Sequence, residues 1–423
     1  MWRHLKGKTL WIGLLAPLLA IGLGAVAYLW DAVPVQLLRN ATFDQMQRWH
    51  PRPYVEAPVR VVDIDDESLR RLGQWPWPRT RLAELTARLQ DAGAAAIVFD
   101  VMFAEPDRTS PASMLTLWDA PPPLRQAMVG LPDHDAVFAD AIGRGRVVLG
   151  FSVTHGRVAD TTEQAASTEA TTQAPRNEAR FIALGEPPAS YLHDFSEGVD
   201  SLPALATAAA GNGALTFIPD ADGVVRKVPL LMRRQGVVVP SLVAEALRVA
   251  QGARNITTRT SPEKGVGLEE VRIGAASIRT TPQGEAWVHY SRASPQRTLP
   301  VWKVMAGQVP ATELKDRILL VGASAQGLLD LRFSPLTGII PGVEVHAQFL
   351  EQALTGGGLD RPSWAPAVEA SVLVFGGLVV TGIALSTGAL LSFAVFAALL
   401  ALWAGVAWRA FAAHGLLIDA ATP

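Results

Sequence analysis

Residues 59–100 read VRVVDIDDESLRRLGQWPWPRTRLAELTARLQDAGAAAIVFD, and this stretch decides the fold. The β-branched run at 59–64 is typical of a buried strand. Leucines at 82, 85 and 89 have helical spacing, and Gly93 is placed to end that helix. A second buried strand follows in AAAIVFDVMF. Strand, helix and strand at this spacing predict a βαβ unit whose two strands are parallel neighbours in one sheet.

The same alternation continues through the middle of the chain. A helix is expected around 133–142, followed by a strand in VVLGFSV. From Gly211 the pattern predicts short strands around a turn at 220–223, where Asp side chains precede a glycine. DRILLVGAS reads as a buried strand and PGVEVHAQFLEQAL as a helix. We therefore expect one α/β domain with a mixed sheet, interrupted at 156–180 by a polar, disordered insertion.

Both ends of the chain are apolar enough to meet a membrane. Residues 10–30 carry no charge and follow Arg3, Lys6 and Lys8, which predicts a cytoplasmic N-terminus, with a cleaved signal peptide as the alternative. An amphipathic helix at 31–49 is expected to continue this first helix outward as a stalk. From 367 to 407 the only charge is Glu369, and this span predicts two crossings with a turn at 386–388.

These patterns divide the chain into seven segments and predict a multi-pass membrane protein whose main domain lies outside the cytoplasm. The segments are a cytoplasmic N-terminus (1–9), a first transmembrane helix (10–30), a stalk helix and linker (31–57), the outer domain (58–365), a second (367–386) and a third transmembrane helix (389–409), and the start of a further membrane segment or a tail (410–423). Because an odd number of crossings leaves the C-terminus outside, we expect the natural chain to continue.

Composition excludes several classes of function. The chain has no cysteine, so disulfides, thiolate metal sites and cysteine nucleophiles are absent. Its formal net charge of -2 gives no reason to expect a nucleic-acid partner.

Carboxylates follow two of the predicted strands, and a serine follows a third. Ligand sites in open α/β sheets lie beyond the carboxyl ends of parallel strands, so these side chains are expected at one rim, where they would bind a ligand or organise loops. The candidates are Asp63, Asp65, Asp66, Trp75, Trp77, Arg79, Asp100, Glu105, Asp107, Ser324 and Asp330. Asp63, Asp65 and Asp100 would be the ligands of a divalent cation, if one binds; no other cofactor is expected.

Structural interpretations of the same residues stay open. Arg79 could join carboxylates in a buried network that holds loops, and the two tryptophans could be rigid plugs or the walls of a pocket. Asp63 and Asp65 superficially resemble a phosphatase-type DxD pair, but no HExxH, GxSxG or Walker loop accompanies them. His346 has no acidic or histidine partner one turn further along its helix, which favours a packed side chain.

Five stretches together resemble the second type of CHASE domain, an extracellular sensor of bacterial transmembrane receptors. They are residues 59–108, GNGALTFIPDADGVVRKVPLL, VPSLVAEAL, LKDRILLVGASAQGLLDLRFSPL and PGVEVHAQFLEQALTGGGLDRPSW, in the order of the family. The resemblance implies a periplasmic sensor that one N-terminal helix holds outside the bacterial inner membrane of a multi-pass protein. Three helices and a cytoplasmic cyclase or kinase are expected to follow it. It assigns no catalytic residue to the sensor. The sequence departs from the pattern by lacking a complete third C-terminal helix and an output domain.

Three functions are therefore weighed. The favoured one is a sensor module, not itself an enzyme, that binds an unknown small molecule or periplasmic protein and pairs with a second copy through the stalk. The alternative is a scaffolding protein of the envelope. The least favoured is a carboxylate- or metal-dependent hydrolase that uses Asp63 and Asp65.

Overall fold

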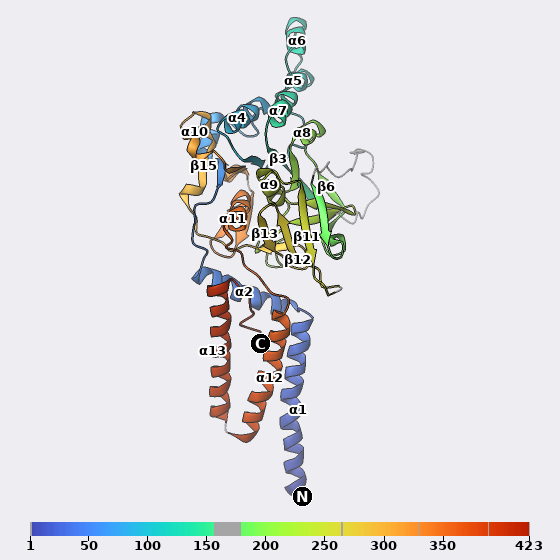
Figure 1. Cartoon of the computed structure of the whole chain (residues 1–423), viewed down its shortest axis with the longest axis vertical. Helices are drawn as coiled ribbons and strands as arrows, with labels where there is room; N and C mark the ends of the chain where they lie inside the picture. The colour runs from blue at the N-terminus through green and yellow to red at the C-terminus, as the bar shows by residue number, and fades with distance from the viewer. Residues whose placement is uncertain (1, 156–178, 264, 329, 388, 423) are drawn as a thin grey trace. The chain divides into compact units, whose positions relative to one another are not determined.

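The computed structural model describes residues 2–155, 179–263, 265–328, 330–387 and 389–422, with side chains described from Leu15 onward. The chain forms two compact units. A helical unit comprises Met1–Arg52, Ala221–Gly223 and Leu359–Pro423, and an α/β unit comprises Pro53–Asp220 and Val224–Gly358. The α/β architecture that the sequence predicts is confirmed, and Figure 1 shows its strands and helices.

A mixed seven-stranded sheet forms the centre of the α/β unit. Its order is β15 (Thr298–Pro300), β1 (Val59–Ile64), β16 (Ile318–Ala323), β2 (Ala96–Phe99), β3 (Val147–Thr154) and β6 (Glu197–Val199), with β7 (Gly211–Ala214) also paired to β3. All of these pairs are parallel except β3 with β6. All residues of β1 and β2 are buried, as expected for strands covered on both faces.

The predicted pairing of the first two strands is wrong in one respect. β1 and β2 are parallel and share the sheet, but β16 lies between them and pairs with both. Five of the six residues of β16 are buried, and so apolar a strand gains most from neighbours on both sides. The βαβ pattern indicates direction and sheet membership, but it cannot show that a strand more than 200 residues later enters between the pair.

Helices cover both faces of this sheet. On one face, α9 (Leu242–Ala250) and α11 (Gly342–Thr355) pack with the side chains of Val59, Val61 and Leu320. The opposite face carries alternate residues of the same strands and packs against α4 (Arg79–Asp91), α7 (His134–Gly143), α8 (Pro203–Ala208) and α10 (Val301–Met305). The short helix α3 (Asp66–Leu72) follows β1. The helices expected around residues 82–93 and 133–142 are confirmed.

Smaller sheets complete the α/β unit. They are β10–β9–β5 (Val237–Pro240, Leu231–Arg234, Asp194–Phe195), β13–β12–β11–β4 (Ala276–Arg279, Leu268–Ile273, Asn255–Thr260, Arg180–Leu184), β14–β8 (Glu285–Trp287, Lys227–Pro229) and β17–β18 (Leu331–Ser334, Gly338–Pro341). Two further helices are α5 (Pro111–Leu117) and α6 (Pro122–Val129). Of the insertion predicted at 156–180, residues 156–178 lie outside the described part of the chain, and Arg180 begins β4.

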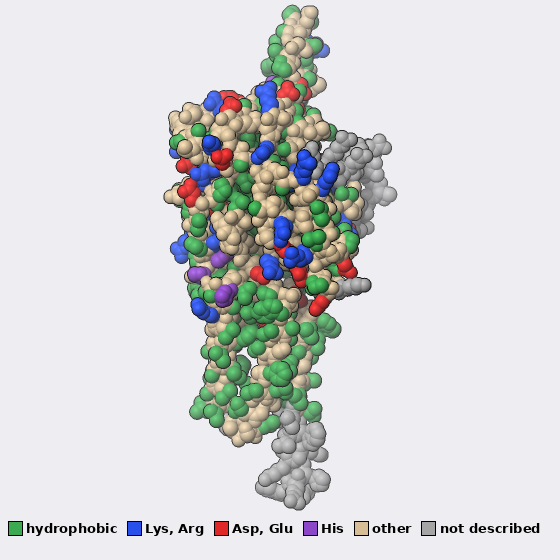
Figure 2. All heavy atoms as spheres, in the orientation of Figure 1, with side chains coloured by type: hydrophobic (Ala, Val, Ile, Leu, Met, Phe, Trp, Pro, Cys, Tyr) green, Lys and Arg blue, Asp and Glu red, His purple; other side chains and the backbone are tan. Residues whose placement is uncertain are grey.

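The helical unit contains α1 (Trp2–Leu29), α2 (Val33–Trp49), α12 (Ala365–Ser386) and α13 (Ala389–His414). Among the described residues, α12 and α13 are long and apolar enough to cross a membrane, and the turn between them falls where the sequence predicts it. Leu15–Leu29 and Val33–Trp49 pass the same test only as a pair. Hydrophobic side chains cover the visible face of α12 and α13, whereas charged side chains gather over the α/β unit (Figure 2).

Two expectations for the helical unit need correction. α2 does not continue α1, because the two helices are bent by 74° at a break where Asp31 has a positive φ of 49°. The third apolar helix does not end at residue 409 but continues to His414. Beyond it the chain is extended, and a β-bridge joins Leu416 to Asp360, so GLLI is not helical here.

Candidate functional site

Asp63 and Ser324 meet at the carboxyl edge of the central sheet. Asp63 lies at the end of β1, and Ser324 directly follows β16, which is the neighbouring strand. The carboxylate of Asp63 accepts hydrogen bonds from the Ser324 amide (2.9 Å) and hydroxyl (2.6 Å). Burial raises the pKa of Asp63 to about 6, against the effect of the hydrogen bonds from Ser324. The structure thus places these two candidates together, as the parallel-strand argument requires.

Asp100 and His346 form a second, deeper pair at this edge. Asp100 directly follows β2, and its carboxylate lies 3.6 Å from Nε2 of His346 on α11. His346 is 1% exposed, and neither of its ring nitrogens has a hydrogen-bond partner among the described residues. Burial raises the pKa of Asp100 to about 8 and lowers that of His346 to about 3. At neutral pH the two groups are therefore mostly uncharged, and the proton stays on the carboxyl group.

Three further side chains surround this pair. Phe217 stacks on the His346 ring at 4.4 Å between centroids, and the Arg332 guanidinium lies 5.5 Å from the Phe217 ring. Asp330 pairs with Arg332 at 2.8 Å, and both side chains are partly exposed (37% and 38%). We call Asp100, Phe217, Asp330, Arg332 and His346 the carboxyl-edge cluster. It combines a buried, uncharged pair with a cation that reaches solvent.

The remaining acidic candidates near β1 do not join the cluster. Asp65 caps α3 by accepting a hydrogen bond from the Ser68 amide (2.7 Å), and Asp66 is the first residue of that helix. In the described part of the chain, no three His, Asp or Glu side chains are grouped as a metal ion requires. Asp63, Asp65 and Asp100 are therefore not brought together as a set of three cation ligands.

Arg79 belongs to a loop-fixing network. Its backbone amide donates to Asp107 (2.7 Å), its guanidinium donates to the Glu105 carbonyl (3.3 Å), and its Nε lies 3.3 Å from Asp135. Burial favours a higher pKa for Asp107, but hydrogen bonds from Arg79 and Thr109 outweigh it and lower the pKa. These contacts join the loop after β2 to the start of α4, which is the structural interpretation of Arg79.

The two tryptophans are in edge-to-face contact at 5.4 Å. Trp77 is 2% exposed, and its indole donates to the Gly73 carbonyl (2.7 Å). Trp75 is half-buried beside it. Trp77 is therefore a core residue that holds the loop before α4, which matches the plug interpretation.

Sequence reasoning missed the partner of His346. A search one turn further along its own helix finds no acid, because the carboxylate directly follows a strand 246 positions earlier. Phe217 and Arg332 were missed as well. The usable signal was the position of Asp100 directly after a buried strand, combined with a histidine whose neighbours three and four positions along the helix, Val343, Phe349 and Leu350, are apolar.

The fold and this edge define an α/β domain attached to apolar, membrane-length helices, with a polar cluster where such sheets bind ligands. The chain belongs to the CHASE2 domain family, because the family model matches residues 18–384. CHASE2 domains are extracellular sensor domains of signalling receptors and are sensory rather than catalytic. No curated protein and no solved structure matches the chain.

Proposed function

We propose that this chain is the periplasmic input module of a bacterial inner-membrane receptor. A small polar ligand would bind at the carboxyl-edge cluster, and the helical unit would pass the change to a cyclase or kinase output in the cytoplasm. The module would act as a homodimer. A small molecule is favoured over a partner protein because the Asp100–His346 pair of the cluster is buried.

One observation carries this proposal: the matched family region contains the α/β unit inserted between helices of a second unit. The chain enters the α/β unit at Pro53 and leaves it at Gly358, and α12 and α13 follow at once. An α/β domain placed before two membrane-length helices is the arrangement that an extracellular sensor needs.

His346 supports the cluster as the ligand site. Buried polar atoms nearly always have a hydrogen-bond partner, and one without a partner calls for an explanation. Both ring nitrogens of His346 lack one here, at the carboxyl edge of parallel strands. A ligand that hydrogen-bonds to the imidazole would satisfy them, and Arg332 would favour an anionic group on that ligand.

Single-cysteine labelling tests the orientation, since the chain has no cysteine of its own. Ala275→Cys lies on the surface of the α/β unit, and Thr387→Cys lies between α12 and α13. A membrane-impermeant maleimide added to spheroplasts should label the first at once and the second only after permeabilisation. The opposite order would place the α/β unit in the cytoplasm and remove the receptor role.

A thermal-shift screen of carboxylic acids, amino acids and sugars tests the ligand site. A compound that stabilises the full chain should lose its effect in Arg332→Gln but keep it in Arg272→Gln, an exposed arginine (55%) on another sheet. Equal effects in both variants would place the ligand elsewhere.

A further inference from the structure

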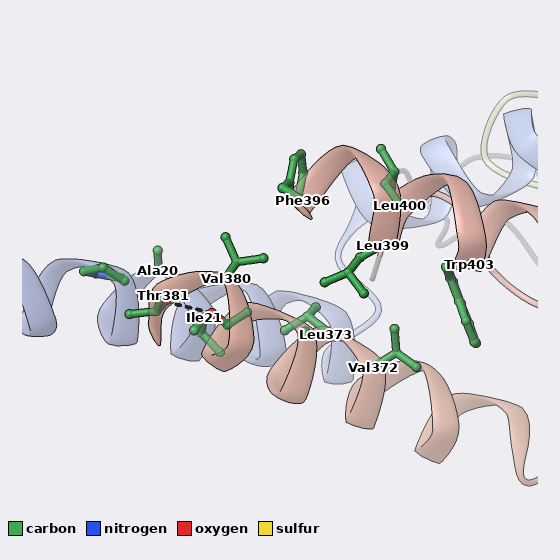
Figure 3. Close-up of a pocket in the computed structure, with 13 residues that line it drawn as sticks. Ala20, Ile21, Val372, Leu373, Val380, Thr381, Phe396, Leu399, Leu400 and Trp403 are labelled. Carbon is green, nitrogen blue, oxygen red and sulfur yellow. Dashed lines mark hydrogen bonds between the residues drawn. The ribbon is translucent and has the colours of Figure 1, made fainter. Parts of the chain in front are cut away.

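The helical unit contains an apolar cavity of about 280 Å³ between α1, α12 and α13 (Figure 3). Its lining is Pro17, Ala20, Ile21, Val372, Leu373, Gly376, Gly377, Val380, Thr381, Phe396, Leu399, Leu400 and Trp403. The polar groups of the two lining side chains that have them are already engaged. The Thr381 hydroxyl donates to the Gly377 carbonyl (2.7 Å), and the Trp403 indole donates to the Asp419 carbonyl (2.8 Å).

Two adjacent glycines, Gly376 and Gly377, line the cavity on α12 and play different roles. A Cβ atom on Gly377 would lie 2.8 Å from Ile21, so α1 and α12 approach closely there. At Gly376 a Cβ atom would meet no heavy atom within 4 Å. The cavity is therefore bounded on one side by close helix packing and left open at Gly376.

We propose that one acyl chain of a membrane phospholipid occupies this cavity. The Thr381 and Trp403 donors are engaged, so water would find only the Thr381 hydroxyl oxygen as an acceptor, whereas an ordered water needs two to four polar partners. An empty cavity would leave its lining without dispersion contacts. Because α12 and α13 have the length and composition to cross a bilayer, hydrocarbon is the solvent that surrounds them.

Trp403 connects this lipid site to a buried polar node. The indole that lines the cavity holds Asp419, and the Asp419 amide donates to Glu369 (2.7 Å). Glu369 is fully buried and also binds the Arg361 guanidinium through both oxygens (3.0 and 2.8 Å) and the Tyr28 hydroxyl. An occupant that fixes the Trp403 ring therefore also fixes the extended segment 415–422 against α1 and α12.

Photo-crosslinking in nanodiscs tests the site on the full chain. The probe is a phosphatidylcholine that carries a diazirine in one acyl chain, and labelled peptides are mapped by mass spectrometry. We expect label on cavity residues such as Leu373 and Leu399. Gly376→Leu should lose that label, whereas Gly382→Leu, which also has free space but lies outside the cavity lining, should keep it. Label confined to outward residues such as Phe375 and Phe393, or labelling of the cavity by a diazirine fatty acid alone, would overturn the proposal.

A second experiment tests the hydrogen bond by which Trp403 holds the extended segment 415–422. Ala420 is buried, so Ala420→Cys should react slowly with maleimide. Adding Trp403→Phe keeps an aromatic ring in the cavity but removes the indole donor, and the labelling rate should rise. An unchanged rate would show that the segment is held without Trp403.

Discussion

Replacing Asp100 with asparagine should remove a pH dependence of stability that the buried carboxyl group imposes. In the folded protein its pKa is about 8, whereas an unfolded aspartate titrates near 3.8. At neutral pH the folded state therefore binds a proton that the unfolded state does not. Stability from this group is fully present below about pH 4 and is lost as the pH rises toward and through 8.

The size of the effect follows from the same pKa. Between about pH 6.5 and pH 8, one group with this shift lowers the free energy of unfolding by roughly 1.5 kcal/mol. Other buried groups of the site contribute little in this window. His346 is neutral in the folded state, and loss of the proton from its unfolded imidazole raises the stability by only about 0.4 kcal/mol in this window. Asp63 titrates mainly below pH 6.5. The nearby charges of Asp330 and Arg332 act on Asp100 in opposite directions.

Urea unfolding of the full chain in detergent micelles, followed by tryptophan fluorescence, measures this dependence. Wild type should lose the stated free energy from pH 6.5 to 8, and Asp100→Asn should not. Asp91→Asn, an exposed aspartate on α4, serves as the control and should behave like wild type. If Asp100→Asn keeps the wild-type slope, Asp100 is ionised in the folded state, His346 carries the proton, and the neutral pair is refuted.

Three further predictions concern packing and assembly. Arg297→Ala removes the two hydrogen bonds that Arg297 donates to the buried Glu351 carboxylate and should destabilise the fold by about 3–5 kcal/mol. Arg70→Ala, in an exposed ion pair, should leave the stability nearly unchanged, and urea midpoints measure both. Leu38→Cys, on the exposed side of α2, should form an oxidative crosslink between two copies in membranes, whereas Met46→Cys, at a buried position, should not. If no position on the exposed side of α2 forms a crosslink, the stalk dimer is refuted. Trp77→Phe loses one buried hydrogen bond and should lower stability by about 1 kcal/mol, and an unchanged melting curve would contradict that role.

The spacing of apolar residues predicted those helices and strands whose pattern is complete within a few neighbouring residues. The continuous apolar runs of β1 and β16 and the leucine spacing of α4 could be read directly from the sequence, because burial on both faces or on one helical face fixes residue type. The sequence did not predict the three-residue strand β15 or the hairpin β17–β18. β15 pairs with β1, which is distant in sequence, and β16 likewise enters between distant strands, whereas β17 and β18 pair with each other across a short turn.

The candidate site likewise has one part that the sequence could predict and one part that it could not. Asp63 and Ser324 could be placed together because each follows a parallel strand, and that position is visible in the sequence. The Asp100–His346 pair could not be derived, since the helix carrying His346 crosses the sheet at a place that only the fold sets. Asp65 illustrates the opposite error, because an aspartate after a strand is as well suited to cap the next helix as to bind a ligand.

The helix α11 gives a physical reason to expect a response beyond the cluster. Besides His346 it buries Gln348 and Gln352, whose side-chain oxygens accept from the amides of Ser291 and His289 (2.7 Å each). Buried polar groups of this kind tolerate little independent movement, because displacing one leaves its partner unsatisfied. A ligand at His346 would therefore move α11 together with the chain at 289–291, as one body.

That body ends where the chain passes to the helical unit. α11 stops at Thr355, Gly356 takes a left-handed conformation (φ 79°), and two more glycines precede Leu359, the first residue of the other unit. Glycine backbone angles change at little energetic cost, so these glycines would absorb a rotation of α11 before it reached the helical unit. We therefore expect the α/β unit to signal by displacing the C-terminal end of α11 and not by rotating this helix. Stiffening the linker with Gly357→Ala should then leave the response to ligand intact, whereas lengthening it by two residues should weaken the response. A response lost in the first variant and kept in the second would require transmission by rotation instead.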